Sequence, residues 1–271
     1  MTADCHLHTR FSDDSDTPPE DMAERAIALG MKSICITDHY DMDFPGGEYV
    51  LNTEKYQAEL ARLKQQYEGR LEIRTGVELG LQPHLQEKLR QYLENCAFDY
   101  VIGSVHLVKG QDPYDRELLD MTDEEMYREY FRFTLENVES MEGFHSLGHL
   151  DYAVRYGYDR GSSYSYGRYA ELIDEILKTL IRKDIALEVN TGGLRYGLGF
   201  PNPHPDVLKR YRELGGEMVT LGSDAHVPSG MGYGFTEAAR LLKEAGFGSV
   251  TEFRRGRPEE IPCLLYTSRC V

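Results

Sequence analysis

The 271-residue sequence predicts an α/β protein in which βα units surround a parallel sheet. Short runs rich in apolar and β-branched residues alternate with longer segments of helical periodicity, which is typical of parallel strands joined by helices. A chain of this length can bury a full core as one domain. No repeat, low-complexity tract or linker marks a boundary, so we expect one domain over residues 1–262.

Seven short apolar runs predict strands at residues 3–8, 33–39, 72–81, 100–106, 146–151, 185–191 and 218–226. Apolar residues at helical spacing predict helices at residues 19–29, 53–67, 122–141, 169–182, 206–214 and 236–245. Gly30 and Gly215 stand where a helix C-terminus favours glycine, and Thr122 with Glu125 forms a capping-box motif. Residues 263–271 continue no pattern and are predicted to be a tail foreign to the fold.

The composition argues against several classes of partner. A formal net charge of −16 disfavours a surface built to bind nucleic acid or anionic lipid, because both need clustered Lys and Arg. The chain has no secretion signal pattern and no apolar run long enough to cross a bilayer, so we expect a cytoplasmic protein without a membrane partner. Five cysteines without a CxxC pair indicate reduced thiols, neither a disulfide framework nor a thiolate zinc site.

Histidines gather at the ends of the predicted strands. Of nine histidines, six lie at or near such an end: His6, His8, His39, His106, His149 and His226. Barrel enzymes place their catalytic groups at the C-terminal ends of their strands. A structural role could explain any one of these residues, but their joint placement indicates one shared site.

Strand alternation places several of these residues on common faces. His6 and His8 lie two positions apart and share one face of a strand, and Asp224 and His226 repeat this spacing. Glu78 lies among apolar and small neighbours, where burying a carboxylate without a partner is costly. A ligand shared by two cations would remove that cost. These positions therefore predict a metal site.

Two further features of the sequence allow either a functional or an ordinary role. The loop after His8 carries Asp13, Asp14 and Asp16, which can form a polar turn or supply a metal ligand. Arg155 and Arg195 each follow a predicted strand end, where a guanidinium group suits a pair of phosphate oxygens. Solvated surface arginine is the equal alternative for both.

Several short segments, taken in chain order, resemble those of the PHP (polymerase and histidinol phosphatase) superfamily and, within it, those of the histidinol-phosphate phosphatase branch. The segments that carry the resemblance are His6-Leu7-His8, Thr37-Asp38-His39, Arg74 to Glu78, Ser104-Val105-His106, Gly148 to Asp151, Asn190 to Arg195 and Gly222 to His226. The resemblance implies a distorted (β/α)7 TIM-like barrel that holds two or three divalent metal ions, zinc, manganese or iron.

The resemblance also implies which residues bind each ion. The first ion would be bound by His6, His8, Glu78 and Asp224. The second would be bound by Glu78, His106 and His149. The third would be bound by His39 and His226, with Asp14 in a position where many relatives have histidine, and with Asp13 as the alternative. An oxygen ligand in that position favours manganese or iron.

The implied activity is a phosphomonoesterase that converts L-histidinol phosphate to L-histidinol and phosphate in histidine biosynthesis, so the expected partner is a small phosphorylated metabolite. Asp224 would orient the attacking water or take a proton, and Arg155 and Arg195 would hold the phosphoryl group. A PHP phosphodiesterase or exonuclease is one alternative, which the acidic composition opposes. A non-catalytic metal-stabilised domain is the other, which the intact ligand set opposes. The sequence leaves the oligomeric state open.

Overall fold

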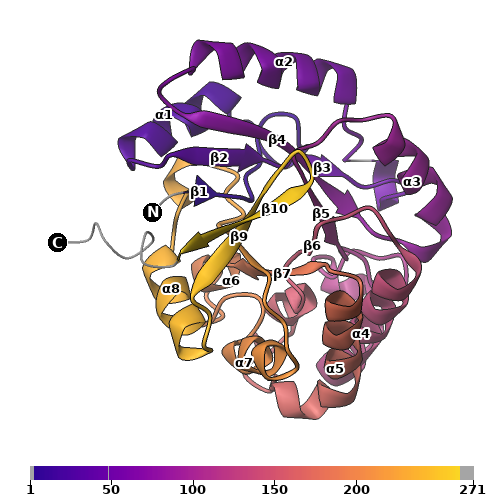
Figure 1. The fold of residues 1–271 in the computed structure, drawn as a ribbon. Helices are drawn as coiled ribbons and strands as arrows, with labels where there is room; N and C mark the ends of the chain where they lie inside the picture. Colours follow the sequence, from indigo (N-terminus) through magenta and orange to yellow (C-terminus); the bar gives the residue numbers. More distant parts are fainter. Residues whose placement is uncertain (1–2, 48, 263–271) are drawn as a thin grey trace.

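A computed structural model of the chain describes residues 3–47 and 49–262. An eight-stranded sheet occupies its centre, with helices outside it (Figure 1). The strands are β1 (Ala3–Asp4), β2 (Ser33–Ile36), β3 (His39–Tyr40), β4 (Glu72–Gly80), β5 (Tyr100–Ser104), β6 (Ser146–Leu147), β7 (Ala186–Asn190) and β8 (Val219–Gly222). Neighbouring strands pair in parallel in the order β1-β2-β4-β5-β6-β7-β8, and β3 pairs with β4.

The first and last strands of this order also meet. Beyond β1 and β8 the backbone nitrogen of His8 donates to the carbonyl of Ala225 at 3.0 Å, and that of Asp224 donates to the carbonyl of His6 at 2.9 Å. These hydrogen bonds close the sheet into a barrel. Strand β3 follows β2 along the chain after a break at residues 37–38. The predicted distorted (β/α)7 barrel is confirmed.

The helices are α1 (Pro19–Ala28), α2 (Thr53–Gln66), α3 (Gln86–Glu94), α4 (Asp123–Ser140), α5 (Tyr166–Arg182), α6 (Gly192–Arg195), α7 (Pro205–Glu213) and α8 (Phe235–Glu244). Short 3-10 helices are η1 (Pro45–Gly47), η2 (Pro83–Leu85), η3 (Arg116–Leu118), η4 (Tyr152–Tyr156) and η5 (Pro228–Gly230). The predicted capping box of Thr122 and Glu125 begins α4. Among the described residues, no helix has the length and apolarity needed to cross a membrane.

Two of these helices were not predicted. Helix α3 is nine residues long, and Leu89, Tyr92 and Leu93 stand at helical spacing and pack on the core, so its sequence carried a short helix signal that was missed. Helix α6 is a four-residue turn after β7, too short to show a period. The predicted tail at residues 263–271 lies outside the described residues.

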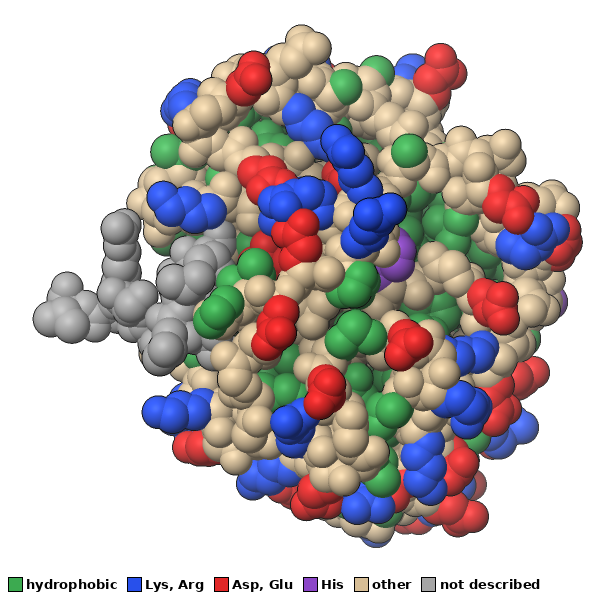
Figure 2. Space-filling model, viewed as in Figure 1, with side chains coloured by type: hydrophobic (Ala, Val, Ile, Leu, Met, Phe, Trp, Pro, Cys, Tyr) green, Lys and Arg blue, Asp and Glu red, His purple; other side chains and the backbone are tan. Residues whose placement is uncertain are grey.

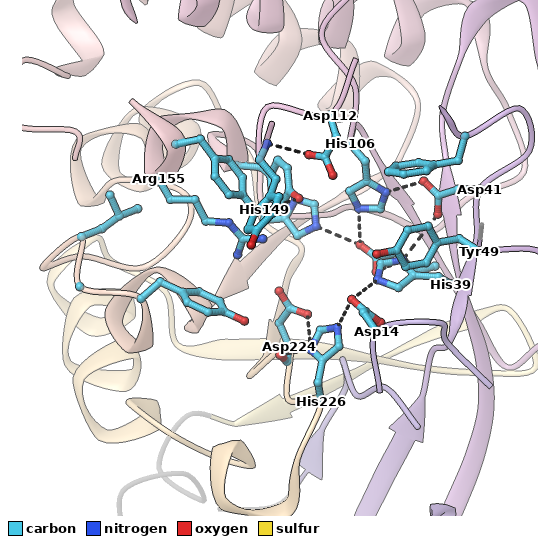
Figure 3. A pocket seen from close by; sticks show the side chains of 18 of the residues that line it. Asp14, His39, Asp41, Tyr49, His106, Asp112, His149, Arg155, Asp224 and His226 are labelled. Atoms are coloured by element: carbon cyan, nitrogen blue, oxygen red, sulfur yellow. Dashed lines mark hydrogen bonds and ion pairs between the residues drawn. The ribbon is translucent and has the colours of Figure 1, made fainter. Parts of the chain in front are cut away.

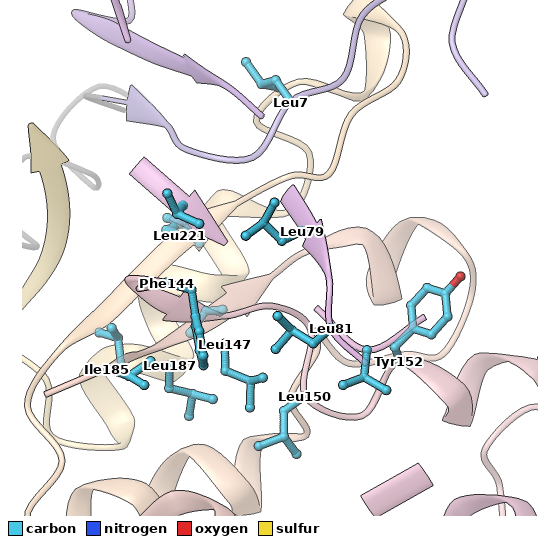
Figure 4. Packing of buried hydrophobic residues seen from close by; sticks show 14 of the residues in the cluster. Leu7, Leu79, Leu81, Phe144, Leu147, Leu150, Tyr152, Ile185, Leu187 and Leu221 are labelled. Atoms are coloured by element: carbon cyan, nitrogen blue, oxygen red, sulfur yellow. The ribbon is translucent and has the colours of Figure 1, made fainter. Parts of the chain in front are cut away.

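Leucines from several strands pack together in the core (Figure 4). Leu7, Leu79, Leu187 and Leu221 are all at most 1% exposed. Since successive side chains on a strand point to opposite faces, each leucine places its sequence neighbours on the other face. Those neighbours include His6, His8, Glu78 and Glu188. Burying the leucines on one face therefore directs the polar side chains into the barrel.

An antiparallel hairpin, β9 (Ser249–Arg254) and β10 (Arg257–Pro262), crosses the barrel in Figure 1 and was not predicted. Phe253 stacks on Tyr100 with ring centroids 5.3 Å apart, and Glu252 accepts a 2.7 Å bond from Arg74. The β10 sequence is polar and holds two prolines, so it lacks an apolar strand pattern. On the face that Figure 2 shows, Lys and Arg side chains are mostly interspersed with Asp and Glu, with one short run of basic side chains in the upper centre.

Candidate metal centre

The carboxyl ends of the barrel strands meet at a cavity of about 680 Å³ (Figure 3). The predicted site residues in its wall are Asp14, His39, Glu78, His106, His149, Arg155, Asp224 and His226. His6 and His8 are fully buried and both contact Glu78. Strands β3 and β4 and the segments that follow β1, β5, β6 and β8 thus bring together every predicted metal ligand.

Glu78 on β4 is the centre of the cluster and is completely buried. Its Oε2 atom lies 3.1 Å from His6 Nε2, 3.3 Å from His8 Nε2 and 3.2 Å from His39 Nδ1. Its Oε1 atom lies 3.2 Å from His106 Nε2 and 2.9 Å from His149 Nε2. Each oxygen therefore faces a separate set of imidazoles, which is the arrangement required of a carboxylate that bridges two cations.

The electrostatics of the cluster favour bound positive charge. Burial opposes ionisation of Glu78, but His6, His39 and His106 outweigh it and hold the pKa of Glu78 well below its usual range. Burial likewise opposes ionisation of Asp224, and nearby histidines lower its pKa well below normal. Such buried carboxylates need either protonated imidazoles or metal ions beside them.

Several buried atoms of the cluster lie close to carboxylates or imidazoles without forming a well-aligned hydrogen bond. Among the described side chains, these atoms include His8 Nε2, His39 Nδ1, Asp41 Oδ2 and His226 Nε2. Buried polar groups are normally well hydrogen-bonded, so converging nitrogen and oxygen atoms without such bonds fit a binding site for a cation. Four groups have ligand atoms within 4.8 Å of one another: His6-His8-Asp224, Glu78-His106-His149, His8-His39-His226 and His39-Asp41-His106. Nitrogen and carboxylate donors of this kind suit zinc, manganese or iron.

The structure distinguishes the two aspartates of the loop after His8. Asp14 Oδ2 lies 2.9 Å from His226 Nε2 and 3.7 Å from His39 Nε2. The Asp13 carboxylate instead accepts a hydrogen bond from the backbone nitrogen of Tyr49. Asp14 therefore lies with the third group of expected ligands, whereas Asp13 holds the neighbouring loop.

Two buried carboxylates beside the cluster were not predicted. Asp41 Oδ1 lies 2.6 Å from His106 Nδ1, and Glu188 Oε1 lies 2.6 Å from His6 Nδ1. A carboxylate on the second nitrogen of a metal-binding histidine fixes the orientation of the ring. Asp41 lies two positions after His39, so the alternation that indicated His6 and His8 could have indicated it. Glu188 lies in the middle of β7, two positions before Asn190, and offered the same signal more weakly.

The two predicted arginines lie differently. Arg155 is part of the cavity wall, and its guanidinium carbon lies 4.2 Å from the ring centre of Tyr152 and 4.7 Å from that of Tyr196. In Figure 3 it faces His39 and Asp41 from the other side of the cavity. Arg195 is not among the described residues that line the cavity, and it donates to the main-chain oxygen of Asp224 at 2.5 Å.

The outer part of the cavity is aromatic and contains one more acid. Tyr114, Tyr156 and Tyr196 line it, together with Asp112. Burial raises the pKa of Asp112, whose carboxylate accepts a hydrogen bond from the backbone nitrogen of Tyr114 at 2.8 Å. Arg160, which the sequence analysis did not single out, also lines this part. The cavity therefore offers cations and anions to a ligand that carries both charges.

Comparison with known proteins agrees with this geometry. The family model of the PHP domain matches residues 4–192. This chain belongs to the PHP domain family. The PHP chain is 35% identical over 257 residues to the histidinol-phosphatase of Lactococcus lactis subsp. lactis, covering 92% of this chain and 93% of that protein. It is 35% identical over 256 residues to a probable histidinol-phosphatase of Clostridium acetobutylicum, covering 92% of this chain and 96% of that protein.

Solved structures show the same fold. The crystal structure of the L. lactis histidinol phosphate phosphatase, complexed with zinc, L-histidinol and phosphate, matches with a TM-score of 0.87 and 33% identity over 95% of this chain and 98% of that chain. A putative histidinol phosphatase of Listeria monocytogenes matches with a TM-score of 0.76 and 20% identity over 87% of this chain and 99% of that chain, which supports the fold. The resemblance of the sequence to PHP proteins is therefore confirmed.

Proposed function

We propose that this PHP protein is a metal-dependent phosphomonoesterase that hydrolyses L-histidinol phosphate to L-histidinol and phosphate in histidine biosynthesis. The observation that carries the proposal is the buried Glu78, whose two oxygens meet five imidazoles at the floor of a cavity that also holds Arg155. The relatives named as histidinol-phosphatases at 35% identity support the choice of substrate.

The ligand groups can hold two or three divalent ions. We assign His6, His8, Glu78 and Asp224 to the first, Glu78, His106 and His149 to the second, and His39, His226 and Asp14 to the third. Zinc, manganese and iron all suit these donors, and the zinc in the L. lactis protein favours zinc here. Bound ions would activate water and offset phosphate charge, the two contributions that metals make to ester hydrolysis.

Asp224 and Arg155 supply the remaining chemistry of the chain. Asp224 lies in the cavity wall with Oδ1 3.3 Å from His8 Nε2, where its carboxylate can orient the attacking water or take its proton. The guanidinium group of Arg155 lies against the rings of Tyr152 and Tyr196, and these rings restrict its orientation before substrate binds. Two parallel N–H groups then match two phosphoryl oxygens. Phosphoryl transfer needs mainly alignment and charge stabilisation, so no covalent nucleophile is required.

The outer cavity fits the histidinol part of the substrate. Histidinol carries a protonated amine and an imidazole, and the exposed ring of Tyr114 in this wall can attract a cation. Asp112 adds a partly buried carboxylate in the same wall. These groups would favour an amino alcohol over a sugar phosphate or a nucleotide, whose non-phosphate parts lack the positive charge.

The test measures kcat/KM for a panel of phosphate esters, using protein loaded with zinc, manganese or iron. We expect kcat/KM for L-histidinol phosphate to exceed that for sugar phosphates and nucleoside monophosphates by about a hundredfold or more, because buried polar groups strongly reject ligands that leave them unpaired. Faster cleavage of a nucleotide diester would replace the proposal with a phosphodiesterase activity. Absence of turnover with every metal would indicate a non-catalytic domain.

A further inference from the structure

We propose that Glu188 is a positioning residue that holds one ligand of each of two neighbouring metal groups, the His6 imidazole and the backbone of His149. This inference rests on the proposed metal site and extends it to a residue outside the ligand set. Glu188 lies in the middle of β7 and is 1% exposed.

Both oxygens of Glu188 meet hydrogen-bond donors. Oε1 lies 2.6 Å from His6 Nδ1. Oε2 accepts from the backbone nitrogen of His149 at 2.8 Å and from the side-chain amide of Asn190 at 3.2 Å. A carboxylate accepts hydrogen bonds on both of its oxygens. The side-chain amide of glutamine has the same shape, but it offers one acceptor oxygen and one donor nitrogen.

The contact with His6 decides which nitrogen of that ring can bind metal. An ionised carboxylate only accepts hydrogen bonds, so the proton of neutral His6 belongs on Nδ1. The lone pair is then on Nε2, which lies 3.1 Å from Glu78 Oε2 and 3.7 Å from Asp224 Oδ1. Glu188 thus directs the metal-binding nitrogen of His6 toward the other ligands of the first group.

Gly222 lies against Glu188 and His6, and a side chain there would clash with both. A Cβ atom on Gly222, in the adjacent strand β8, would lie 2.8 Å from Glu188 Oε1 and 2.3 Å from His6 Cβ. The absence of a side chain at Gly222 therefore lets Glu188 and His6 approach each other.

The contact with His149 couples Glu188 to the second group of ligands. His149 Nε2 lies 2.9 Å from Glu78 Oε1, the oxygen that faces His106. Its backbone nitrogen is held by the carboxylate that also holds His6. The distance between the two ligand groups therefore depends on one buried side chain as well as on Glu78.

The experiment compares zinc binding by Glu188→Gln and by a matched control, Glu252→Gln. Glu252 is 3% exposed and accepts from Arg74 at 2.7 Å in the β9–β10 hairpin, away from the cluster. We expect Glu188→Gln to bind zinc about 10–100-fold more weakly and to lose it faster to a chelator, as when other partners of metal-bound histidines are removed. Glu252→Gln should keep the stoichiometry and release rate of the unmodified protein even where it lowers thermal stability.

Zinc retention within twofold of the unmodified protein would overturn the proposal. A second measurement needs no variant: in the zinc-loaded unmodified protein, nitrogen-15 spectra of labelled histidine should show a proton on Nδ1 of His6, and zinc on Nδ1 with the proton on Nε2 would also overturn the proposal. Neither readout uses substrate. If the protein binds zinc as described but does not hydrolyse histidinol phosphate, only the proposed function is wrong. If it binds no zinc, the proposed function and the proposed role of Glu188 are both wrong.

Discussion

The guanidinium group of Arg195 donates a hydrogen bond to the main-chain oxygen of Asp224 at 2.5 Å. Asp224 has a φ of 55°, in the left-handed region that residues other than glycine seldom adopt. The bond stabilises this backbone conformation, which turns the Asp224 carboxylate toward His6 and His8. Arg195 therefore acts on the site through Asp224.

Replacing Arg195 by alanine should lower kcat by about 10–100-fold and speed the loss of zinc to a chelator, because a partner of Asp224, a proposed metal ligand, is removed. KM should change less, since the side chain does not line the cavity. Arg195→Lys should recover part of the activity, because an ammonium group can donate the single bond to the Asp224 carbonyl. Steady-state kinetics and zinc release measure both effects, and a large rise in KM alone would instead make Arg195 a phosphate ligand.

Arg155→Ala should reduce kcat/KM by about 100-fold or more and weaken inhibition by inorganic phosphate, because the charged fork in the cavity is lost. Arg155→Lys should recover little, since an ammonium group does not offer two parallel N–H groups. Zinc content should stay unchanged, which separates Arg155 from Arg195. Undiminished phosphate inhibition in Arg155→Ala would contradict the assignment.

Glu78→Gln keeps the side-chain volume but removes the charge that five imidazoles surround. We expect turnover to fall by about 1,000-fold or more and the zinc content to fall by at least one ion, because a bridging ligand serves both ions. Circular dichroism should show a folded barrel. Activity within a few fold of the unmodified protein would show that Glu78 is not the bridge.

Removal of metal should destabilise the fold. The cluster buries Glu78, Asp224 and several imidazoles whose charges a cation balances, and a ligand that binds only the folded state stabilises it in proportion to the logarithm of its concentration. Chelator treatment should lower Tm, and added zinc should restore it together with activity. An unchanged Tm across a zinc titration would argue against binding linked to folding.

His145 should make stability depend on pH. Its Nδ1 accepts from the backbone nitrogen of Val101 at 2.9 Å, and burial lowers its pKa to about 4, whereas an unfolded histidine titrates near 6.5. Between these pH values the unfolded chain binds a proton at His145 and the folded chain does not. The contribution of neutral His145 to the free energy of unfolding is therefore full above pH 6.5 and falls as the pH drops toward 4. At about 1.4 kcal/mol per pKa unit it amounts to at most about 3 kcal/mol.

The variant His145→Asn keeps an acceptor for Val101 and removes the titration. Measured by urea unfolding of metal-free protein, its free energy of unfolding should fall less between pH 6.5 and pH 4.5 than that of the unmodified chain, by about 2 kcal/mol. The metal ligands titrate in both proteins, so their contribution cancels in the difference. Equal pH slopes would mean that His145 titrates alike in the folded and unfolded states.

The sequence by itself determined the strands and the residues that gather at their ends. Strand alternation is a local property, so the two-residue spacing of His6 and His8 indicates a shared face. Asp224 and His226 were predicted in the same way, but they lie beyond the end of β8, and Asp224 has a φ of 55°, so the turn there directs them to the site. The helix signals of Thr122 and Gly30 are local as well. Resemblance to PHP proteins then identified the same ligands as one set.

Tertiary structure decided which atoms of those residues meet. His6 and Glu188 are 182 positions apart, and only closure of the barrel brings Nδ1 of one to 2.6 Å from Oε1 of the other. The different placements of Arg155 and Arg195, and of Asp13 and Asp14, depend in the same way on loops from separate strands. The β9–β10 hairpin was missed because packing of Phe253 against Tyr100 defines it, whereas its own sequence period is weak. Contacts of this kind depend on the arrangement of the whole chain, so no local pattern carries them.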